Sequence, residues 1–183
     1  MASRCILQRE VTFATLQRYF GKAEVIALGA CDGTSRAEFG HTARTAGRSA
    51  DTFIDDSVDL LRGFDFSIAF ENTNKTGYIT EKIVSAYLAG TIPIYWGTPD
   101  VFSIFNEESF VFAPKFHSAD DLAHHLQELR RSGGLKKMQA APILIPGALE
   151  RYFSWRSEVK GPLKSWLIDR ALDMLNALAD PDS

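Results

Sequence analysis

Residues 64–97, FDFSIAFENTNKTGYITEKIVSAYLAGTIPIYWG, constrain the fold of this chain more than any other stretch. The segment opens with a short apolar run, 66–70, which is typical of a buried strand. A polar segment follows, and residues 81–89 then place apolar side chains at helical spacing. Residues 91–96 are apolar again. Strand, polar loop, helix and strand in this order predict one unit of an α/β fold with a parallel sheet.

Local signals set the ends of these elements. Thr80 is a suitable N-cap for the helix, and Gly90 is a suitable residue to end it. Pro93 cannot donate a hydrogen bond to a sheet. We therefore expect the second strand to pair only through residues 94–96.

The polar loop that follows the first strand is the predicted place of a ligand site, because open α/β sheets bind ligands beyond the carboxyl ends of their strands. Lys82 falls in the first helical turn, where the helix dipole disfavours a cation. A bound anion would reverse that effect. Glu81 is expected to point about 100° away from Lys82, and Tyr78 lies near the same face if the helix extends back. The alternative, which spacing alone supports equally, is a solvated helix start.

Three segments of this stretch, AFENT (69–73), GYITEKI (77–83) and AYLAGTIPIYWG (86–97), occur together in this order, and Ser109-Phe110-Val111 follows. This set resembles the donor-binding signature of the α-1,3/1,4-fucosyltransferases, family ten of the glycosyltransferases. The similarity extends more loosely over nearly the whole chain. It implies that residues 1–183 form a single Rossmann-like, doubly wound parallel sheet, the C-terminal half of an enzyme with two such domains, whose N-terminal acceptor domain is absent here.

Members of this family transfer L-fucose from GDP-fucose to a hydroxyl of N-acetylglucosamine or glucose, with inversion. The resemblance assigns the donor-binding role to five residues: Arg9, Asn72, Tyr78, Glu81 and Lys82. It places Glu81 near the fucosyl ring, where a carboxylate stabilises oxocarbenium-like charge. Glu71, on the same loop, is a weaker candidate that orients the backbone.

Arg9 matches an arginine that reaches the donor phosphates in the family. Its planar guanidinium suits this role, because it can bind two phosphate oxygens at once. The alternative is a helix-start arginine in solvent. The resemblance favours the phosphate role.

No metal or other cofactor is expected. The only Asp-x-Asp spacing, at 180–182, lies in a polar tail. Arg9, Lys82 and backbone N–H groups are therefore expected to stabilise the GDP leaving group. The general base is expected in the acceptor-binding domain, on a longer or a separate chain. The expected partners are GDP-fucose and a glycan acceptor.

Two other functions stay open. In the first, no acceptor domain accompanies the chain, and it is a stand-alone GDP-sugar-binding or inactive remnant domain. In the second, the fold is the same but the donor is another GDP-sugar. The expected compartment is the cytoplasm for a bacterial protein and the Golgi lumen for a eukaryotic one.

Composition agrees with one domain. A chain of 183 residues that is 45% hydrophobic can bury a sizeable core. The net charge of −3 gives no reason to expect nucleic acid or an anionic membrane as a partner. No apolar run approaches the ~20 residues of a membrane span. Cys5 and Cys31 can form a disulfide, although buried thiols are the default, and the four histidines are interpreted as surface or packing residues.

Outside the central unit, the pattern predicts further elements. These are helices over 11–20 (ended by Gly21), 53–61, 100–105, 119–130, 148–160 and 162–178, strands over 24–30 and 109–112, and a long mobile loop over 32–52, which carries Arg36, Arg44 and Arg48.

Overall fold

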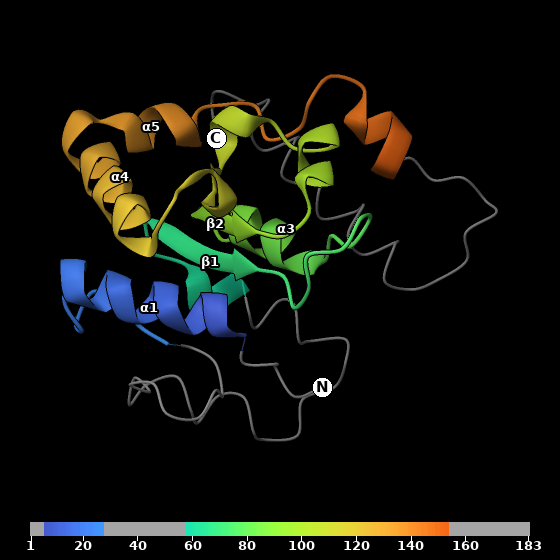
Figure 1. Ribbon diagram of the computed structural model, residues 1–183. Coiled ribbons are helices and arrows are strands. Elements are labelled where there is room, and N and C mark those ends of the chain that lie inside the picture. The colour runs from blue at the N-terminus through green and yellow to red at the C-terminus, as the bar shows by residue number, and fades with distance from the viewer. Residues whose placement is uncertain (1–5, 28–57, 154–183) are drawn as a thin grey trace.

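The computed structural model describes residues 6–27 and 58–153 (Figure 1). Its main elements in chain order are α1 (Leu7–Phe20), β1 (Phe66–Phe70), α3 (Glu81–Leu88), β2 (Ile92–Trp96), β3 (Val111–Phe112), α4 (Ala119–Ser132) and α5 (Gly134–Gln139). Short 3-10 helices occupy Pro99–Ser103, Glu107–Ser109 and Ala113–Lys115, and a π-helical turn spans Leu149–Phe153.

The three strands form one parallel sheet in the order β1-β2-β3. β1 pairs with β2 from Phe66↔Ile92 to Phe70↔Trp96, and β2 pairs with β3 at Ile94↔Val111. Because β1, α3 and β2 form one strand–helix–strand unit, the predicted α/β fold is confirmed.

The expectation for Pro93 is wrong, because β2 pairs with β1 along its whole length. Ile92 donates its N–H to the Asp65 carbonyl at 2.9 Å, before Pro93 in the chain. In a parallel ladder, alternate residues bond to opposite neighbours. Pro93 therefore lacks its donor on the edge that faces β3, and pairing with β3 starts only at Ile94.

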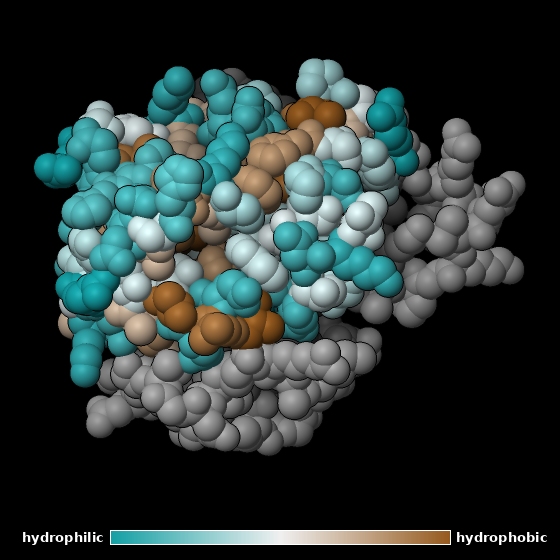
Figure 2. All heavy atoms as spheres, in the orientation of Figure 1, coloured by the Kyte–Doolittle hydropathy of each residue, from teal (hydrophilic) through white to brown (hydrophobic). Residues whose placement is uncertain are grey.

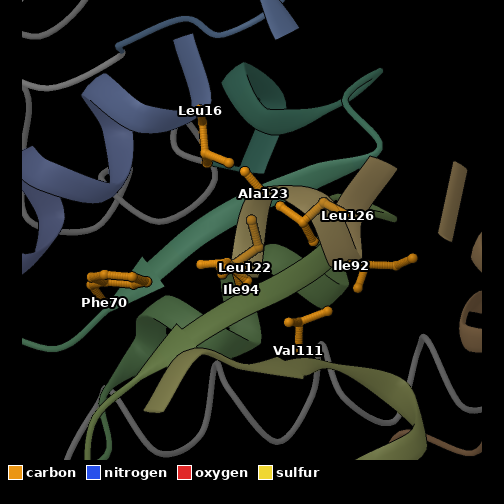
Figure 3. Packing of buried hydrophobic residues seen from close by; sticks show 8 residues of the cluster. All are labelled: Leu16, Phe70, Ile92, Ile94, Val111, Leu122, Ala123 and Leu126. Carbon is orange, nitrogen blue, oxygen red and sulfur yellow. The ribbon is translucent and has the colours of Figure 1, made fainter. Parts of the chain in front are cut away.

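Helices cover both faces of the sheet, as a doubly wound fold requires. On one face, α1 and α4 pack together over the sheet through the cluster in Figure 3: Leu16, Phe70, Ile92, Ile94, Val111, Leu122, Ala123 and Leu126. On the other face, α3 contributes Ile83 and Tyr87, which pack against Ala69 and Tyr95 of the strands. Successive strand residues thus serve opposite cores.

Helix α3 matches its prediction to within one residue at its C-terminal end. Gly90 follows the helix with φ 75°, a conformation that glycine adopts without a steric penalty. Thr80 occupies the N-cap position, but its side chain makes no capping hydrogen bond. The hydroxyl is used elsewhere, in the site described below.

The N-terminal segment departs from its prediction. Helix α1 ends before Gly21 as expected, but it begins at Leu7, four residues earlier than predicted. The predicted strand over 24–30 is wrong over its described part, where residues 22–24 form a turn that continues into a bend at Val25, and Ala27 alone shows a bridge. Gln17 donates its side-chain amide to the Val25 carbonyl at 3.1 Å, which stabilises this arrangement. Residues 28–30 lie outside the described residues.

The remaining elements agree in part. The helix predicted over 119–130 is α4, and residues 58–61 are helical, as the end of the helix predicted over 53–61 requires. The strand predicted from residue 109 is shortened to β3, because a 3-10 helix takes its beginning. Helix α5 was not predicted. It follows α4 at once through Gly133, which has φ 77°. The loop over 32–52 with its arginines, the helix over 162–178, residues 154–160 of the preceding helix, and both cysteines lie outside the described residues.

We predict that the contact between α1 and α4 is pH-dependent. Asp120 accepts a hydrogen bond from the Tyr19 hydroxyl at 2.7 Å and forms an ion pair with Arg18. The Tyr19 hydrogen bond is the main cause that lowers the pKa of Asp120 below 3.8. A lowered folded-state pKa stabilises the fold above the unfolded-state pKa, and this stabilisation is lost as pH falls through the folded-state value.

Asp120→Asn is therefore expected to lower the thermal midpoint at neutral pH and to match the wild type increasingly as pH falls below about 4. Thermal unfolding at several pH values measures the difference. A difference between the two proteins that stays constant down to the acid limit contradicts this assignment.

Candidate functional site

Glu71 joins the end of β1 to the start of α3. It directly follows the strand, and its side chain is fully buried. Its Oε1 accepts the backbone N–H of Thr80 at 2.8 Å, and its Oε2 accepts the Thr80 hydroxyl at 2.7 Å. One carboxylate therefore fixes both the backbone and the side chain of the residue before α3.

Lys82 completes this cluster. Its ammonium donates to Thr80 Oγ1 at 2.9 Å and to Glu71 Oε2 at 3.4 Å, and it lies 3.6 Å from Glu81 Oε1. Two carboxylates thus offset the unfavourable position of a cation at a helix N-terminus. A bound anion is not needed to explain Lys82, and the expectation that Glu81 points away from it is wrong.

Lys82 is nevertheless accessible. Its side chain is 26% exposed, whereas that of Glu71 is 0% exposed. The ammonium therefore lies between a buried carboxylate and solvent. This position allows it to contact a ligand without leaving the cluster entirely.

Arg9 reaches the same edge of the sheet from α1. Its Nη2 donates to the Phe70 carbonyl at 2.6 Å and to Asn72 Oδ1 at 3.3 Å. Burial lowers the pKa of the Arg9 guanidinium, and the charges of Glu10 and Glu71 act in the opposite direction. Arginine stays protonated in proteins, so the structure places a second cation beside the end of β1 and brings Arg9 and Asn72 together.

Tyr78 lies in the loop, outside α3. The helix begins at Glu81, so it does not extend back to Tyr78, and the condition under which Tyr78 would share the face of Lys82 is not met. The backbone N–H of Tyr78 donates to the Lys75 carbonyl at 2.9 Å, and the neighbouring Gly77 donates to Asp100 Oδ2 at 2.6 Å. The first bond closes a turn within the loop, and the second holds the loop against the 3-10 helix that follows β2. Figure 1 shows the loop extending from the tip of β1.

Tyr95 and Gly97 pack against Glu71. The sequence analysis did not propose either residue for the site. Tyr95 is fully buried. A Cβ on Gly97 would lie 2.5 Å from Tyr95 Oη and 2.9 Å from Glu71 Cγ. Gly97 is therefore required for close packing and not for an unusual φ. The signal available in the sequence was its place at the carboxyl end of a strand, opposite the polar loop.

An apolar pocket lies beside the end of β1, close to Arg9. It has a volume of about 310 Å³ and lies between the N-terminal half of α1 and the segment that leads into α4, with lining residues that include Val11, Phe70, Trp96, Phe116 and Leu122. Figure 2 shows apolar side chains gathered over this end of α1, where Leu7 is 72% and Val11 49% exposed. The lining of this pocket is mainly apolar, whereas the cluster at Glu71 is charged.

The described histidines fit the packing roles expected of them. The Tyr19 and His124 rings pack edge to face with their centroids 4.9 Å apart, and the rings of Phe116 and His125 lie 5.1 Å apart. Within residues 6–27 and 58–153, no three His, Cys, Asp or Glu side chains gather as a metal site would need. No helix in that part of the chain is long and apolar enough to cross a membrane.

The family model of glycosyltransferase family 10 (fucosyltransferase), C-terminal part, matches residues 2–172. A parallel α/β sheet binds its ligands beyond the carboxyl ends of its strands, which is where the charged loop lies. The chain belongs to this fucosyltransferase family, as its motifs predicted.

Two curated relatives show the extent of the similarity. The α-(1,3)-fucosyltransferase FucT of Helicobacter pylori is 44% identical over 71 residues, which are 39% of this chain and 15% of that protein. The 4-galactosyl-N-acetylglucosaminide 3-α-L-fucosyltransferase 9 of Mus musculus is 26% identical over 118 residues, which are 62% of this chain and 29% of that protein.

Solved structures agree in fold. An α1,3-fucosyltransferase with GDP superposes with a TM-score of 0.61 at 21% identity, covering 99% of this chain and 46% of the other. An α1,3-fucosyltransferase with GDP-fucose gives a TM-score of 0.57 at 22% identity over 96% of this chain and 44% of the other. The chain thus spans less than half the length of the proteins it matches, and its predicted Rossmann-like fold is confirmed.

Proposed function

We propose that this chain supplies the GDP-fucose site of a fucosyltransferase that transfers L-fucose, with inversion, to a hydroxyl of N-acetylglucosamine or glucose in α-1,3 or α-1,4 linkage. The observation that carries the proposal is the pair of cations at one sheet edge: Arg9 beside Asn72, and Lys82 beside the N-terminus of α3. Family membership and the solved relative that holds GDP-fucose support the choice of donor.

The chemistry follows from these charges. As the bond from fucose to GDP breaks, negative charge develops on the diphosphate. Arg9, Lys82 and the free N–H groups of α3 would stabilise that charge, because they are already held in place before the reaction. Arg9 offers a planar set of donors for two oxygens, whereas Lys82 acts as a point charge.

Glu81 is the proposed carboxylate for the fucosyl ring. Its side chain is 35% exposed and lies 3.6 Å from the Lys82 ammonium. A ligand phosphate on Lys82 would therefore bring the sugar near Glu81, where a carboxylate stabilises oxocarbenium-like charge. Asn72 and Tyr78, on the loop between β1 and α3, would contact the same donor.

We assign the acceptor glycan and the general base to a further domain. An inverting transfer needs a base to remove the proton of the attacking hydroxyl. The matched solved chains are more than twice as long as the region they share with this chain. A GDP-sugar-binding domain without transferase activity is the second candidate, and partial coverage is the observation that favours it.

Calorimetric titration tests the donor site. We expect saturable binding of GDP-fucose and GDP and weaker binding of GDP-mannose. Lys82→Met removes the ammonium and keeps the aliphatic stem, so it should weaken GDP binding about tenfold or more, equivalent to about 1.4 kcal/mol. Lys137→Met, a change at an exposed lysine of α5, is the matched control and should bind like the wild type.

The outcomes separate the two candidates. Binding of GDP-fucose without transfer to an N-acetyllactosamine acceptor, with or without an added acceptor domain, would favour the binding domain. A folded protein that binds no guanine nucleotide would contradict the proposed donor site. Equal losses for Lys82→Met and Lys137→Met would show that net charge, not the position of Lys82, controls binding.

A further inference from the structure

The hydroxyl of Tyr95 is buried beneath the candidate site, and it has no hydrogen-bond partner among the described residues. Buried polar groups in native proteins nearly always have a partner, so an exception calls for a reason. Tyr87, another buried tyrosine, shows the usual arrangement, because its hydroxyl lies 2.7 Å from Ser109 Oγ.

The side chain of Glu71 lies near the Tyr95 hydroxyl. Both side chains occupy the space above Gly97, where a Cβ would lie 2.5 Å from Tyr95 Oη and 2.9 Å from Glu71 Cγ. Burial raises the pKa of the Tyr95 hydroxyl, and the negative charges of Glu71 and, after it, Asp100 raise it further. The Tyr95 hydroxyl and the Glu71 carboxylate are therefore close in space and interact electrostatically.

Glu71 has room for one more donor. Its Oε2 already accepts from the Thr80 hydroxyl and from Lys82, whereas its Oε1 accepts only from the Thr80 N–H. Each carboxylate oxygen offers two lone pairs. If the Lys82 ammonium turned outward, both oxygens would accept hydrogen bonds from Thr80 alone. Arg9, whose charge also interacts with Glu71, donates to Phe70 and Asn72. The buried carboxylate would therefore lose a charged donor, which is strongly unfavourable.

We propose that Tyr95 is a positioning residue whose hydroxyl donates to Glu71 when the Lys82 ammonium turns from Glu71 to an anionic group of a bound ligand, such as a nucleoside diphosphate. The exchange keeps Glu71 bonded to Thr80, so the start of α3 stays in place while Lys82 serves the ligand. The inference rests on the proposed function for the role of Lys82 in anion binding.

The exchange can be tested without any ligand, because Lys82→Met imitates the departure of the ammonium. Tyr95→Phe in the wild-type background removes only an unpaired hydroxyl. We expect the thermal midpoint there to be unchanged or slightly raised. In the Lys82→Met background the same hydroxyl should be bonded to Glu71, and Tyr95→Phe should lower the midpoint by about 2–4 °C.

Tyr87→Phe is the matched control. It removes a buried tyrosine hydroxyl that already has a partner, so it should lower the midpoint equally in both backgrounds. A Tyr95→Phe effect that is likewise equal in both backgrounds would overturn the proposal, since the hydroxyl would then act independently of Lys82. No effect of Tyr95→Phe in either background would overturn it as well.

Titration with GDP gives the second measurement. With Lys82 present, Tyr95→Phe should weaken GDP binding about three- to tenfold, because Lys82 can leave Glu71 only at a greater cost. With Lys82→Met it should change binding no further. A wild-type protein that binds no GDP but shows coupled thermal midpoints would contradict the proposed function and keep the Glu71–Tyr95 exchange. Unaltered GDP affinity in Tyr95→Phe, with wild-type binding intact, would overturn the exchange alone.

Discussion

Replacing Glu71 by alanine is expected to lower the free energy of unfolding by about 3–5 kcal/mol, because it removes the fully buried carboxylate that pairs with the partly exposed Lys82 ammonium. The change also leaves the N–H and hydroxyl of Thr80 without their acceptor. Lys82 would lose its buried carboxylate and keep Thr80 Oγ1 at 2.9 Å and Glu81 Oε1 at 3.6 Å. Urea unfolding of the wild type and the variant measures the difference.

Two further variants sharpen this test. Glu71→Gln keeps the shape and one acceptor oxygen but cannot balance the Lys82 charge, so its loss of stability should be smaller, about 1–3 kcal/mol. Glu108→Ala removes an exposed glutamate and should change stability by less than about 0.5 kcal/mol. If Glu71→Ala behaves like Glu108→Ala, the carboxylate does not hold β1 and α3 together.

The central unit was predictable because its signals are local. An apolar run, a polar loop and helical spacing lie next to one another in the chain, and each determines its element without reference to the rest of the fold. Helix α3 and strand β2 therefore appear where they were expected. The turn over residues 22–24 was not predictable in this way. The apolar run over 24–30 fits a strand, but it contains no signal for the turn that follows α1.

The site was only partly predictable, because its contacts join residues that are distant in the chain. Arg9 and Asn72 are 63 residues apart and meet only because α1 packs beside the end of β1. The family resemblance paired them with the same ligand, whereas spacing could not. Lys82 was interpreted from the helix dipole and from the family resemblance, without a protein partner for its charge. The structure adds Glu71, whose buried charge changes the balance and which was assigned only the weaker role of orienting the backbone.

Gly97→Ala is expected to be the second most disruptive change, with a loss of about 3 kcal/mol in the free energy of unfolding. The new Cβ would lie 2.5 Å from Oη and 2.8 Å from Cζ of Tyr95, and 2.9 Å from Cγ of Glu71. Neither neighbour can move freely, because both side chains are fully buried. Chemical unfolding measures the stability, and GDP titration measures the site.

A double variant separates the steric cause from other effects of alanine at this position. Tyr95→Phe removes the nearest atom and leaves the 2.8 Å contact to Cζ, so combining it with Gly97→Ala should restore part of the lost stability. Sites that touch one another are not additive, and here the combined loss should be smaller than the sum. Wild-type stability in Gly97→Ala would mean that β2 can shift to admit a methyl group. Full stability with lost GDP affinity would mean instead that the Glu71 side chain moves to admit the methyl group and shifts the start of α3 with it.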